Sequence, residues 1–382
     1  MSQRATNPIL PGFNPDPSIV RVGDDYYIAT STFEWYPGVQ IHHSRDLVHW
    51  RLVSRPLRRP SQLDMLGDPD SCGIWAPCLS FDNGLFYLVY TDVKRYGRAI
   101  DGNLGFRDMH NFVVTSPRID GEWSEPVYLN SSGFDPSLFH DEDGRKYLVN
   151  MLWDHRPGKN PFAGIVLEEY SHEERRMLGN RRVIFTGTSI GFTEAPHLYR
   201  KNGYYYLITA EGGTGFGHAV TMARSRELAG PYELHPDKYI LSARHRPDAA
   251  LQRAGHADFV ETPQGEVYMV YLCGRPIANR GRCTLGRETA IQPMRWCEDG
   301  WLRTLDGQGL PMREFPAPNL PAHEFPTSPV REHFDTTELP LPFQWLRSPW
   351  PEELFSLKDR PGHLRLYGRE GMGSFFRQAL VA

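Results

Sequence analysis

The sequence predicts an all-β protein, a five-bladed β-propeller followed by the start of a β-sandwich. The first observation behind this prediction is a segment that recurs five times, with anchor positions 17, 77, 136, 196 and 258, which lie 60, 59, 60 and 62 residues apart. The second is composition: the 382 residues include 35 Gly and 32 Pro, and aromatic residues make up 12%. Many turn formers combined with many aromatic residues favour short strands over long helices.

Each copy of the repeat has the pattern of a β-hairpin. A short strand leads into a polar turn, such as Asn83-Gly84 or Asn202-Gly203, and a strand rich in Tyr, Leu, Val and Ile follows. About four strands in ~60 residues, repeated five times, is typical of a propeller. A solenoid is the alternative, and the absence of Leu-rich or helical repeat patterns counts against it. The anchors are Asp16-Pro17-Ser18, Ala76-Pro77-Cys78, Asp135-Pro136-Ser137, Ala195-Pro196-His197 and Ala257-Asp258-Phe259.

The domain organisation follows from the end of the repeats. We expect the five-bladed propeller to occupy residues 1–310. A Pro-rich linker should follow at residues 311–330, and a partial C-terminal β-sandwich at residues 331–382. Eight prolines fall in the 32 residues from Pro311 to Pro342. After them, FQWLRSP, HLRLYGR and SFFRQALVA resemble strands. This last stretch is too short to bury a core of its own.

Composition also limits the classes of partner. The net charge is −4 and no basic block is present, so nucleic-acid binding is not expected. There is no long apolar run and no apolar core in the stretch MSQRATNPIL, so we expect neither a membrane span nor a secretory signal. The five cysteines form no C-x-x-C pair. Together these features favour a cytoplasmic protein with reduced thiols, either a monomer or a homo-oligomer.

The repeat register predicts a cluster of acids at the centre of the propeller. The first strand of each blade lines the central channel, so residues just before the anchors should form a ring at one mouth. Asp16 and Asp135 lie one step before their anchors, and Glu194, Trp75 and His256 lie two steps before theirs. A single Asp in a D-P-S segment is usually a turn cap. Three acids in register are different, because like charges placed together cost free energy and raise pKa values, which points to a functional cluster.

Such a cluster suits glycoside hydrolysis. That reaction needs one carboxylic acid to protonate the leaving oxygen and one carboxylate to activate water or attack directly. Glu194, in an apolar setting, is the better candidate for the protonated acid. Asp16, in the polar N-P-D-P-S segment, is the better candidate for the ionised base. A third carboxylate beside the acid would raise its pKa and orient it.

The segments around these acids resemble glycoside hydrolase family 43, with the closest likeness to its β-1,4-xylosidases, some of which also act on α-L-arabinofuranosides. The likeness spans essentially the whole chain and is most specific in the opening NPILPGFNPDPSIVRVGDDYYIATSTFEWYPGVQIHHSRDLVHW. The resemblance implies a five-bladed propeller and hydrolysis with inversion. It also implies that Asp16 is the general base, Glu194 the general acid, and Asp135 the residue that tunes and orients the acid.

The resemblance carries further positions with it. Phe33 and Trp75 resemble walls of the pocket for the terminal sugar, and Arg287 the arginine that reaches into the same subsite. His256 resembles a central-channel histidine that binds a metal in some members; we expect no required cofactor, with a structural divalent cation in the channel as the alternative. Phe216, in the loop Gly212–Gly217, is expected at the pocket rim. A phosphate-loop interpretation of that loop fails because no Lys-Ser/Thr follows it.

The C-terminal part departs from the family pattern. Xylosidases of this type carry a longer β-sandwich that lends an aromatic side chain to the active-site wall, and HFDTTELPLPFQWLRSP resembles only its opening. We therefore expect that aromatic contribution to be missing, substrate affinity or solubility to be reduced, and Phe375, Phe376 and Leu380 to be exposed.

The preferred function is an exo-acting, inverting hydrolase that releases xylose from the non-reducing end of short β-1,4-xylo-oligosaccharides. One alternative is an α-L-arabinofuranosidase that uses the same carboxylates. A second is a non-catalytic carbohydrate-binding propeller fragment. A retaining relative that acts on fructosides is less favoured, because it would use a nucleophile in place of the base.

Overall fold

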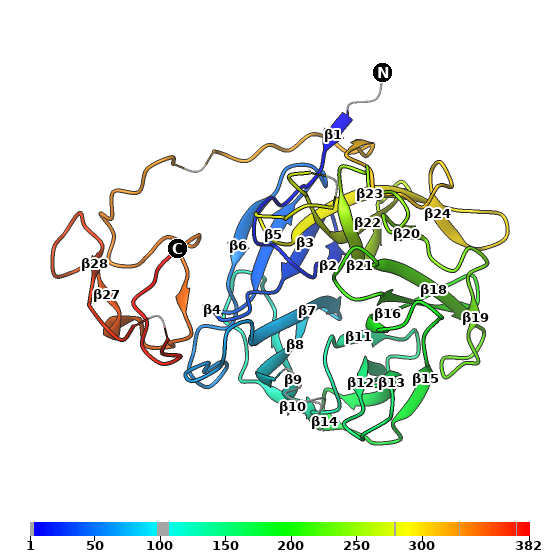
Figure 1. The fold of residues 1–382 in the computed structure, drawn as a ribbon, viewed down its shortest axis with the longest axis horizontal. Helices are drawn as coiled ribbons and strands as arrows, with labels where there is room; N and C mark the ends of the chain where they lie inside the picture. Colours follow the sequence, from blue (N-terminus) through cyan, green and yellow to red (C-terminus); the bar gives the residue numbers. More distant parts are fainter. Residues whose placement is uncertain (1–3, 98–106, 279, 328, 372) are drawn as a thin grey trace.

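The chain folds as a ring of five β-sheets with a smaller C-terminal region beside it. The computed structural model describes residues 4–97, 107–278, 280–327, 329–371 and 373–382, so the first three residues of MSQRATNPIL lie outside the described part. Colours run from blue to yellow around the ring in chain order (Figure 1). The predicted all-β, five-bladed propeller is confirmed. Within these ranges no helix is long and apolar enough to cross a membrane.

Each blade is an antiparallel sheet made from one continuous segment, with its first strand innermost. Blade I contains β2 (Ser18–Val22), β3 (Asp25–Thr30), β5 (Gln40–Ser44) and β6 (Arg51–Ser54). Blade II contains β7 (Gly73–Asp82), β8 (Leu85–Tyr96), β9 (Arg107–Ser116) and β10 (Val127–Asn130). Blade III contains β11 (Ser137–His140), β12 (Lys146–Trp153), β13 (Phe162–Ser171), β14 (Arg176–Met177) and β15 (Arg182–Phe185). Blade IV contains β16 (Glu194–Lys201), β17 (Tyr204–Glu211), β18 (Ala219–Ser225), β19 (Glu233–Leu234) and β20 (Leu241–Ser242). Blade V contains β21 (Gln252–Glu261), β22 (Val267–Gly274), β23 (Glu288–Trp296) and β24 (Leu302–Thr304).

The predicted hairpins form at the first two strands of every blade. Asp82 pairs with Leu85 and Lys201 with Tyr204, which leaves two-residue turns between them. Asn83-Gly84 and Asn202-Gly203 fill these turns with positive φ at both residues. Two-residue hairpin turns of this kind require left-handed backbone, which Asn and Gly tolerate best.

The blades are joined at the centre by polar contacts between their innermost strands. The Ser18 hydroxyl donates to the Pro77 carbonyl at 2.9 Å, and the Ser137 hydroxyl donates to the Pro196 carbonyl at 2.6 Å. The Asp258 carboxylate accepts the Ile19 backbone N–H at 2.8 Å, which connects the last blade to the first. At the centre, the blades are therefore connected to one another by hydrogen bonds between polar groups.

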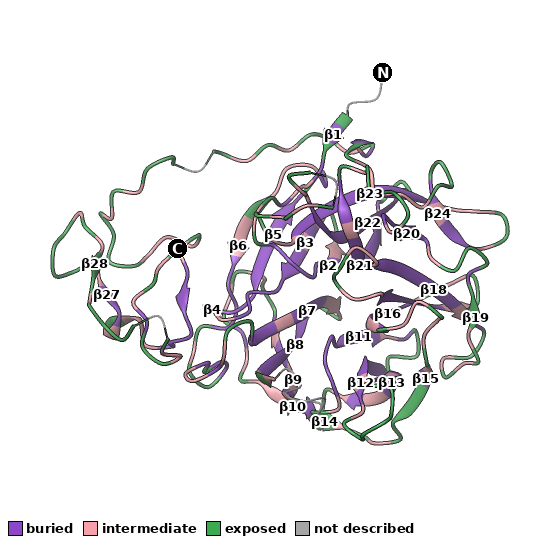
Figure 2. Cartoon of the chain, in the orientation of Figure 1, coloured by how far each residue is buried: buried purple, intermediate pink, exposed green. Residues whose placement is uncertain are grey.

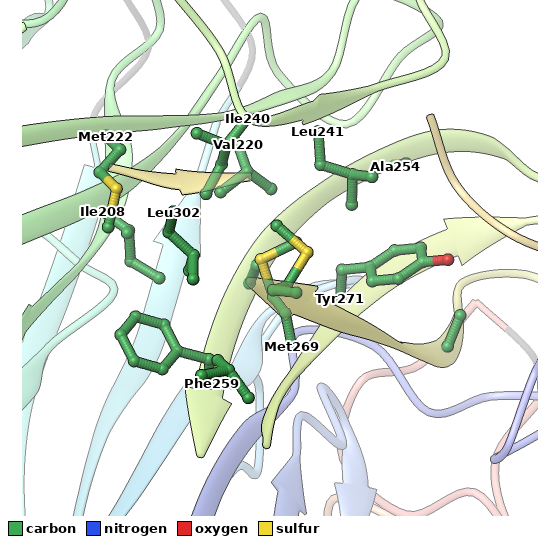
Figure 3. Packing of buried hydrophobic residues seen from close by; sticks show 14 of the residues in the cluster. Ile208, Val220, Met222, Ile240, Leu241, Ala254, Phe259, Met269, Tyr271 and Leu302 are labelled. Atoms are coloured by element: carbon green, nitrogen blue, oxygen red, sulfur yellow. The ribbon is translucent and has the colours of Figure 1, made fainter. Parts of the chain in front are cut away.

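Hydrophobic layers fill the space between neighbouring blades. Between blades IV and V, Ile208 and Met222 meet Met269 and Tyr271, all of them buried (Figure 3). Burial is concentrated in the inner strands of the ring, whereas the Pro-rich stretch and the C-terminal region are largely exposed or half-buried (Figure 2). Alternation along each strand puts one face toward each neighbouring blade, so both faces of a blade are apolar.

The N-terminal segment closes the ring onto blade V. β1 (Arg4–Thr6) pairs with β25 (Glu314–Pro316), which lies within the Pro-rich stretch. The Asn7 amide, fully buried, donates to the Ile291 carbonyl at 2.7 Å and the Met312 carbonyl at 2.8 Å, and its oxygen accepts the Ile291 N–H at 2.9 Å. One side chain thus joins the first segment of the chain to two segments about 300 residues later.

The C-terminal region forms only short strands. β26 (Trp345–Leu346) pairs with β4 (Trp35–Tyr36) on the propeller, and β27 (Phe355–Ser356) pairs with β28 (Arg365–Leu366) after the 3₁₀ helix η1 (Pro351–Glu353). The strand predicted in SFFRQALVA is wrong. Within that segment only Val381 makes a β-bridge, to Trp345.

The predicted exposure of apolar residues near the end of the chain is confirmed in part. Phe376 and Leu380 are exposed. The expectation for Phe375 is wrong, because this residue is half-buried and its ring lies 5.2 Å from the Arg347 guanidinium.

Replacing Asn7 tests the closure of the ring. We expect Asn7→Ala to lower the free energy of unfolding by about 2–4 kcal/mol, since buried carbonyl and N–H groups lose their partners. Chemical denaturation followed by tryptophan fluorescence measures the change. Gln264→Ala, at an exposed turn residue, is the matched control. Equal stability of the two variants would contradict a closing role for Asn7.

Candidate active site

A cavity of about 680 Å³ opens where the innermost strands begin. It contains the three predicted acids, Asp16, Asp135 and Glu194, together with Phe33, Trp75, Arg287 and His256. Of the predicted site residues, only Phe216 is not among its lining residues. Among the residues that the structure describes, the lining is formed by Asp16, Phe33, Asp70, Ser71, Trp75, Tyr96, Arg107, Phe134, Asp135, Trp153, Pro161, Phe162, Phe192, Glu194, Gly213, Thr214, His256 and Arg287.

The same backbone distortion brings the residues of each blade to this mouth. One residue with left-handed φ precedes the regular part of every innermost strand: Asp16 (57°), Ala76 (40°), Asp135 (54°), Ala195 (50°) and His256 (47°). The ladder shifts register there in blades II, IV and V. Such bulges redirect side chains at strand ends.

In the structure, the fifth repeat is shifted by one residue from the register that the anchor positions predict. His256 carries the left-handed φ and therefore corresponds to Asp16 and Asp135, one step before the anchor. The alignment placed His256 two steps before its anchor, level with Glu194, and this was wrong. The sequence pattern takes Asp258 as the counterpart of the anchor prolines, whereas the backbone places Ala257 at that position and Asp258 level with Ser18 and Ser137.

Asp16 is buried and held as a carboxylate. The Ser31 hydroxyl donates to its Oδ2 at 2.7 Å, and Arg287 Nη1 donates to its Oδ1 at 3.1 Å. His256 Nδ1 lies 3.8 Å from the same Oδ1. Burial acts to raise the pKa of Asp16, but the positive charge of Arg287 and the hydrogen bonds from Ser31 and Arg287 outweigh it, so the pKa is lowered.

The pKa values of Glu194 and Asp135 are shifted in the opposite direction, above their ordinary values. Burial, followed by the negative charge of Asp16, raises the pKa of Glu194 to about 8. Burial and the charges of Glu194 and Asp16 raise the pKa of Asp135 well above its ordinary value. Asp135 Oδ2 also accepts the backbone N–H of Ala195 at 3.1 Å, which fixes the chain next to Glu194. Glu194 is the more exposed of the pair, since Asp135 is buried and Glu194 half-buried.

Aromatic rings form one wall of the cavity. The ring centroids of Phe33 and Trp75 are 5.8 Å apart, and those of Trp75 and Phe134 are 5.6 Å apart. The Arg287 guanidinium lies 4.9 Å from the Phe33 ring centre while it binds Asp16. This wall offers apolar faces to the C–H groups of a sugar ring, next to hydrogen-bonding groups for its hydroxyls.

A second set of lining residues was missed by the sequence analysis. Arg107 lies between the rings of Tyr96 and Trp153, at 3.7 and 3.8 Å, and Phe162 and Phe192 continue this side of the cavity. Most of these residues lie at the ends of the outer strands β8, β9, β12 and β13. The repeat comparison covered only the start of each blade, so it contained no signal for them.

Phe216 packs away from the cavity, near two arginines. The guanidinium carbons of Arg253 and Arg280 lie 4.6 and 5.6 Å from its ring centre. From the same Gly-rich loop, Gly213 and Thr214 do reach the cavity.

The central histidines do not form a metal site by themselves. Burial lowers the pKa of His256 to about 3 and that of His218 to about 4, so both rings are neutral. In the part of the chain that the structure describes, no group of three or more His, Cys, Asp or Glu side chains is arranged to hold a metal ion. The structural cation in the channel therefore stays a prediction, and no chemical step is assigned to it.

The chain is similar to known proteins over nearly its whole length. Residues 5–302 match the family model "Glycosyl hydrolases family 43", and residues 331–382 match "Beta xylosidase C-terminal Concanavalin A-like domain". The chain is 59% identical to "Xylosidase/arabinosidase 43B" of Humicola insolens, over 98% of this chain and 68% of that protein. It is 54% identical to "Beta-xylosidase" of Bacillus subtilis (strain 168), over 99% of this chain and 71% of that protein.

A solved structure shows the same fold at similar identity. The crystal structure of xylan β-1,4-xylosidase from Bacillus halodurans C-125 aligns with a TM-score of 0.95 and 58% identity, over 99% of this chain and 71% of that one. Family model, sequence relatives and solved structure therefore agree on the propeller fold and on one family. The chain belongs to family 43 of the glycosyl hydrolases, a family of inverting glycosidases.

Proposed function

We propose that this chain is a β-xylosidase that removes xylose from the non-reducing end of short β-1,4-xylo-oligosaccharides with inversion. The observation that carries the proposal is that the pKa values of two carboxyl groups in one cavity are shifted in opposite directions. The pKa of Asp16 is lowered, while that of Glu194 is raised to about 8. Near neutral pH the cavity therefore holds one base and one acid, the pair that inverting hydrolysis needs. The names of the relatives support the sugar.

In this mechanism, Glu194 donates its proton to the glycosidic oxygen as that bond breaks. Asp16 accepts a proton from a water molecule that attacks the anomeric carbon from the opposite face. The bond to the leaving sugar breaks, the bond to water forms, and the product has the inverted anomeric configuration. Arg287 and Ser31 keep Asp16 ionised before the step through their contacts with its two oxygens.

Asp135 acts on the acid through position and charge. It accepts the Ala195 N–H, which restricts the backbone beside Glu194. It also adds a third carboxyl to the buried cluster, so full ionisation of the cluster is unfavourable at neutral pH. We assign it the role of orienting Glu194 and keeping the cluster partly protonated.

The volume of the cavity supports the proposal that the substrates are short. About 680 Å³ lies in the range of pockets that enclose a small ligand. An arabinofuranoside is the second candidate substrate, because one relative at 59% identity is named a xylosidase/arabinosidase. Comparing xylobiose with an aryl α-L-arabinofuranoside measures the preference of this chain.

Asp16→Asn tests the base. We expect kcat for xylobiose to fall by about 10²–10⁴-fold, because the carboxamide cannot accept the proton of water. Proton NMR of the wild-type reaction should show α-xylose as the first product. Asp143→Asn, at an exposed carboxylate outside the cavity, is the control. Early β-xylose, or wild-type turnover by Asp16→Asn, would contradict the assignment.

Glu194→Gln tests the acid through the leaving group. Xylobiose has a poor leaving group and should lose about 10²–10⁴-fold in kcat/KM. An aryl xyloside with an acidic phenol leaves without full protonation and should lose far less. Steady-state kinetics on both substrates give the ratio. An equal loss on both would show that Glu194 does not donate the proton.

The pH profile should follow the two shifted groups. Activity needs Asp16 ionised and Glu194 protonated. It should therefore be retained well into the acidic range, where the lowered pKa of Asp16 lies, and decline as pH rises through about 8, the pKa of Glu194. Removing the Arg287 charge by Arg287→Gln should raise the pKa of Asp16 and move the acidic limb of kcat/KM to higher pH. An unmoved acidic limb would refute the role of Arg287.

A further inference from the structure

Arg347, in the C-terminal region, is fully buried against the propeller. Its backbone N–H donates to the Glu34 carbonyl at 2.9 Å, directly after the β26–β4 pairing. Its Nε donates to the Asp68 carbonyl at 2.8 Å, and its Nη1 donates to Gln378 Oε1 at 2.6 Å. Its Nη2 donates to Asp70 Oδ1 at 2.7 Å. With only 1% of its side chain exposed, this guanidinium is fixed in place by acceptors on several sides.

The segment that Arg347 holds forms part of the cavity wall. Asp70 and Ser71 both line the cavity. The Ser71 carbonyl accepts the indole N–H of Trp75 at 2.8 Å, and its own N–H donates to Glu34 Oε2 at 3.2 Å. Arg347 is therefore connected to Trp75 in the aromatic wall through Asp70 and Ser71. β4 and the C-terminal region lie side by side in the ring view (Figure 1).

Asp70 has the position of a binding group at the cavity mouth. Its side chain is 76% exposed, whereas those of Asp16 and Arg347 are 6% and 1% exposed. Arg347 engages Oδ1, and the exposed carboxylate lines the cavity, so it can still accept hydrogen bonds from a ligand there. Because the guanidinium is buried and held by other acceptors, its contact anchors one oxygen of the Asp70 carboxylate at the cavity wall.

We propose that Asp70 accepts hydrogen bonds from hydroxyl groups of the outer, leaving-group sugar, and that Arg347 is the positioning residue for this carboxylate. The inference rests on the proposed function and adds a specificity group to it. The buried acids lie at the floor of the cavity and act on the terminal sugar, whereas Asp70 lies at the mouth, where the next sugar must lie. A hydroxyl-bearing leaving group makes this contact and an aryl group does not.

Comparing two leaving groups tests the proposal. The substrates are xylobiose and 4-nitrophenyl β-xyloside, which share the terminal xylose. Loss of a hydrogen bond to a charged group predicts that Asp70→Ala lowers kcat/KM for xylobiose by about tenfold, mainly through KM. The value for the aryl xyloside should stay within about twofold, since the contact is absent there. Asp70→Asn, which keeps an acceptor for Arg347, should restore part of the loss.

A second variant examines the positioning role. Arg347→Lys keeps the charge but not the fork that reaches both Asp68 and Asp70. It should change the substrate ratio in the same direction as Asp70→Ala, and the double variant should be no worse than Asp70→Ala on xylobiose. Thermal unfolding of each variant reports separately on stability. Asp143→Ala, at an exposed carboxylate that pairs with Arg145 outside the cavity, is the control.

The outcomes separate this inference from the proposed function. A changed ratio of the two substrates supports Asp70 as a specificity group. An equal loss on both substrates, or no loss on either, assigns the Arg347–Asp70 pair a structural role and overturns the inference alone. A folded wild-type chain that hydrolyses neither substrate overturns the proposed function and the inference together.

Discussion

The closed ring of blades is the constraint on which the rest of the structure depends. Five sheets can meet around one axis only if each inner strand is held close to its neighbours, and here serine hydroxyls and the Asp258 carboxylate make those contacts. Every blade then starts at the same end of the axis. A left-handed residue at that point turns the chain into the inner strand, and residues from all five blades meet at one cavity. Chemistry is placed there by changing residues at those positions, without changing the fold.

Burial and compensation together decide the protonation states in this cavity. Desolvation acts on Asp16, Asp135 and Glu194 alike and favours the neutral form of each. Only Asp16 has an arginine on its oxygen and a serine hydroxyl as donor. It takes the negative charge, and that charge in turn raises the pKa of Glu194. The proposed base and acid are thus one electrostatic system, in which the contact with Arg287 favours the negative charge on Asp16.

The C-terminal region is connected to the cavity by side chains as well as by the short β26–β4 pairing. Arg347 reaches across from that region to the segment 68–71, and Trp75 is hydrogen-bonded to the same segment. A residue 331 positions after Asp16 in the chain is therefore part of the support of the cavity wall. Because a buried guanidinium is costly to leave unpaired, this connection is geometrically strict.

The sequence by itself determined the number of blades, their hairpins and the meeting of Asp16, Asp135 and Glu194, because repeated anchors fix which positions become equivalent in a ring. It also indicated Phe33, Trp75, Arg287 and His256, through family resemblance. It did not show the one-residue shift at His256, the position of Phe216 outside the cavity, or the side formed by Tyr96, Arg107 and Trp153. Those outcomes, and the contact of Arg347 with Asp70, were decided by the tertiary structure. The physical reason is that these features depend on distances between side chains and loops that come from distant segments and do not repeat. The period of the sequence repeat carries no information about such distances.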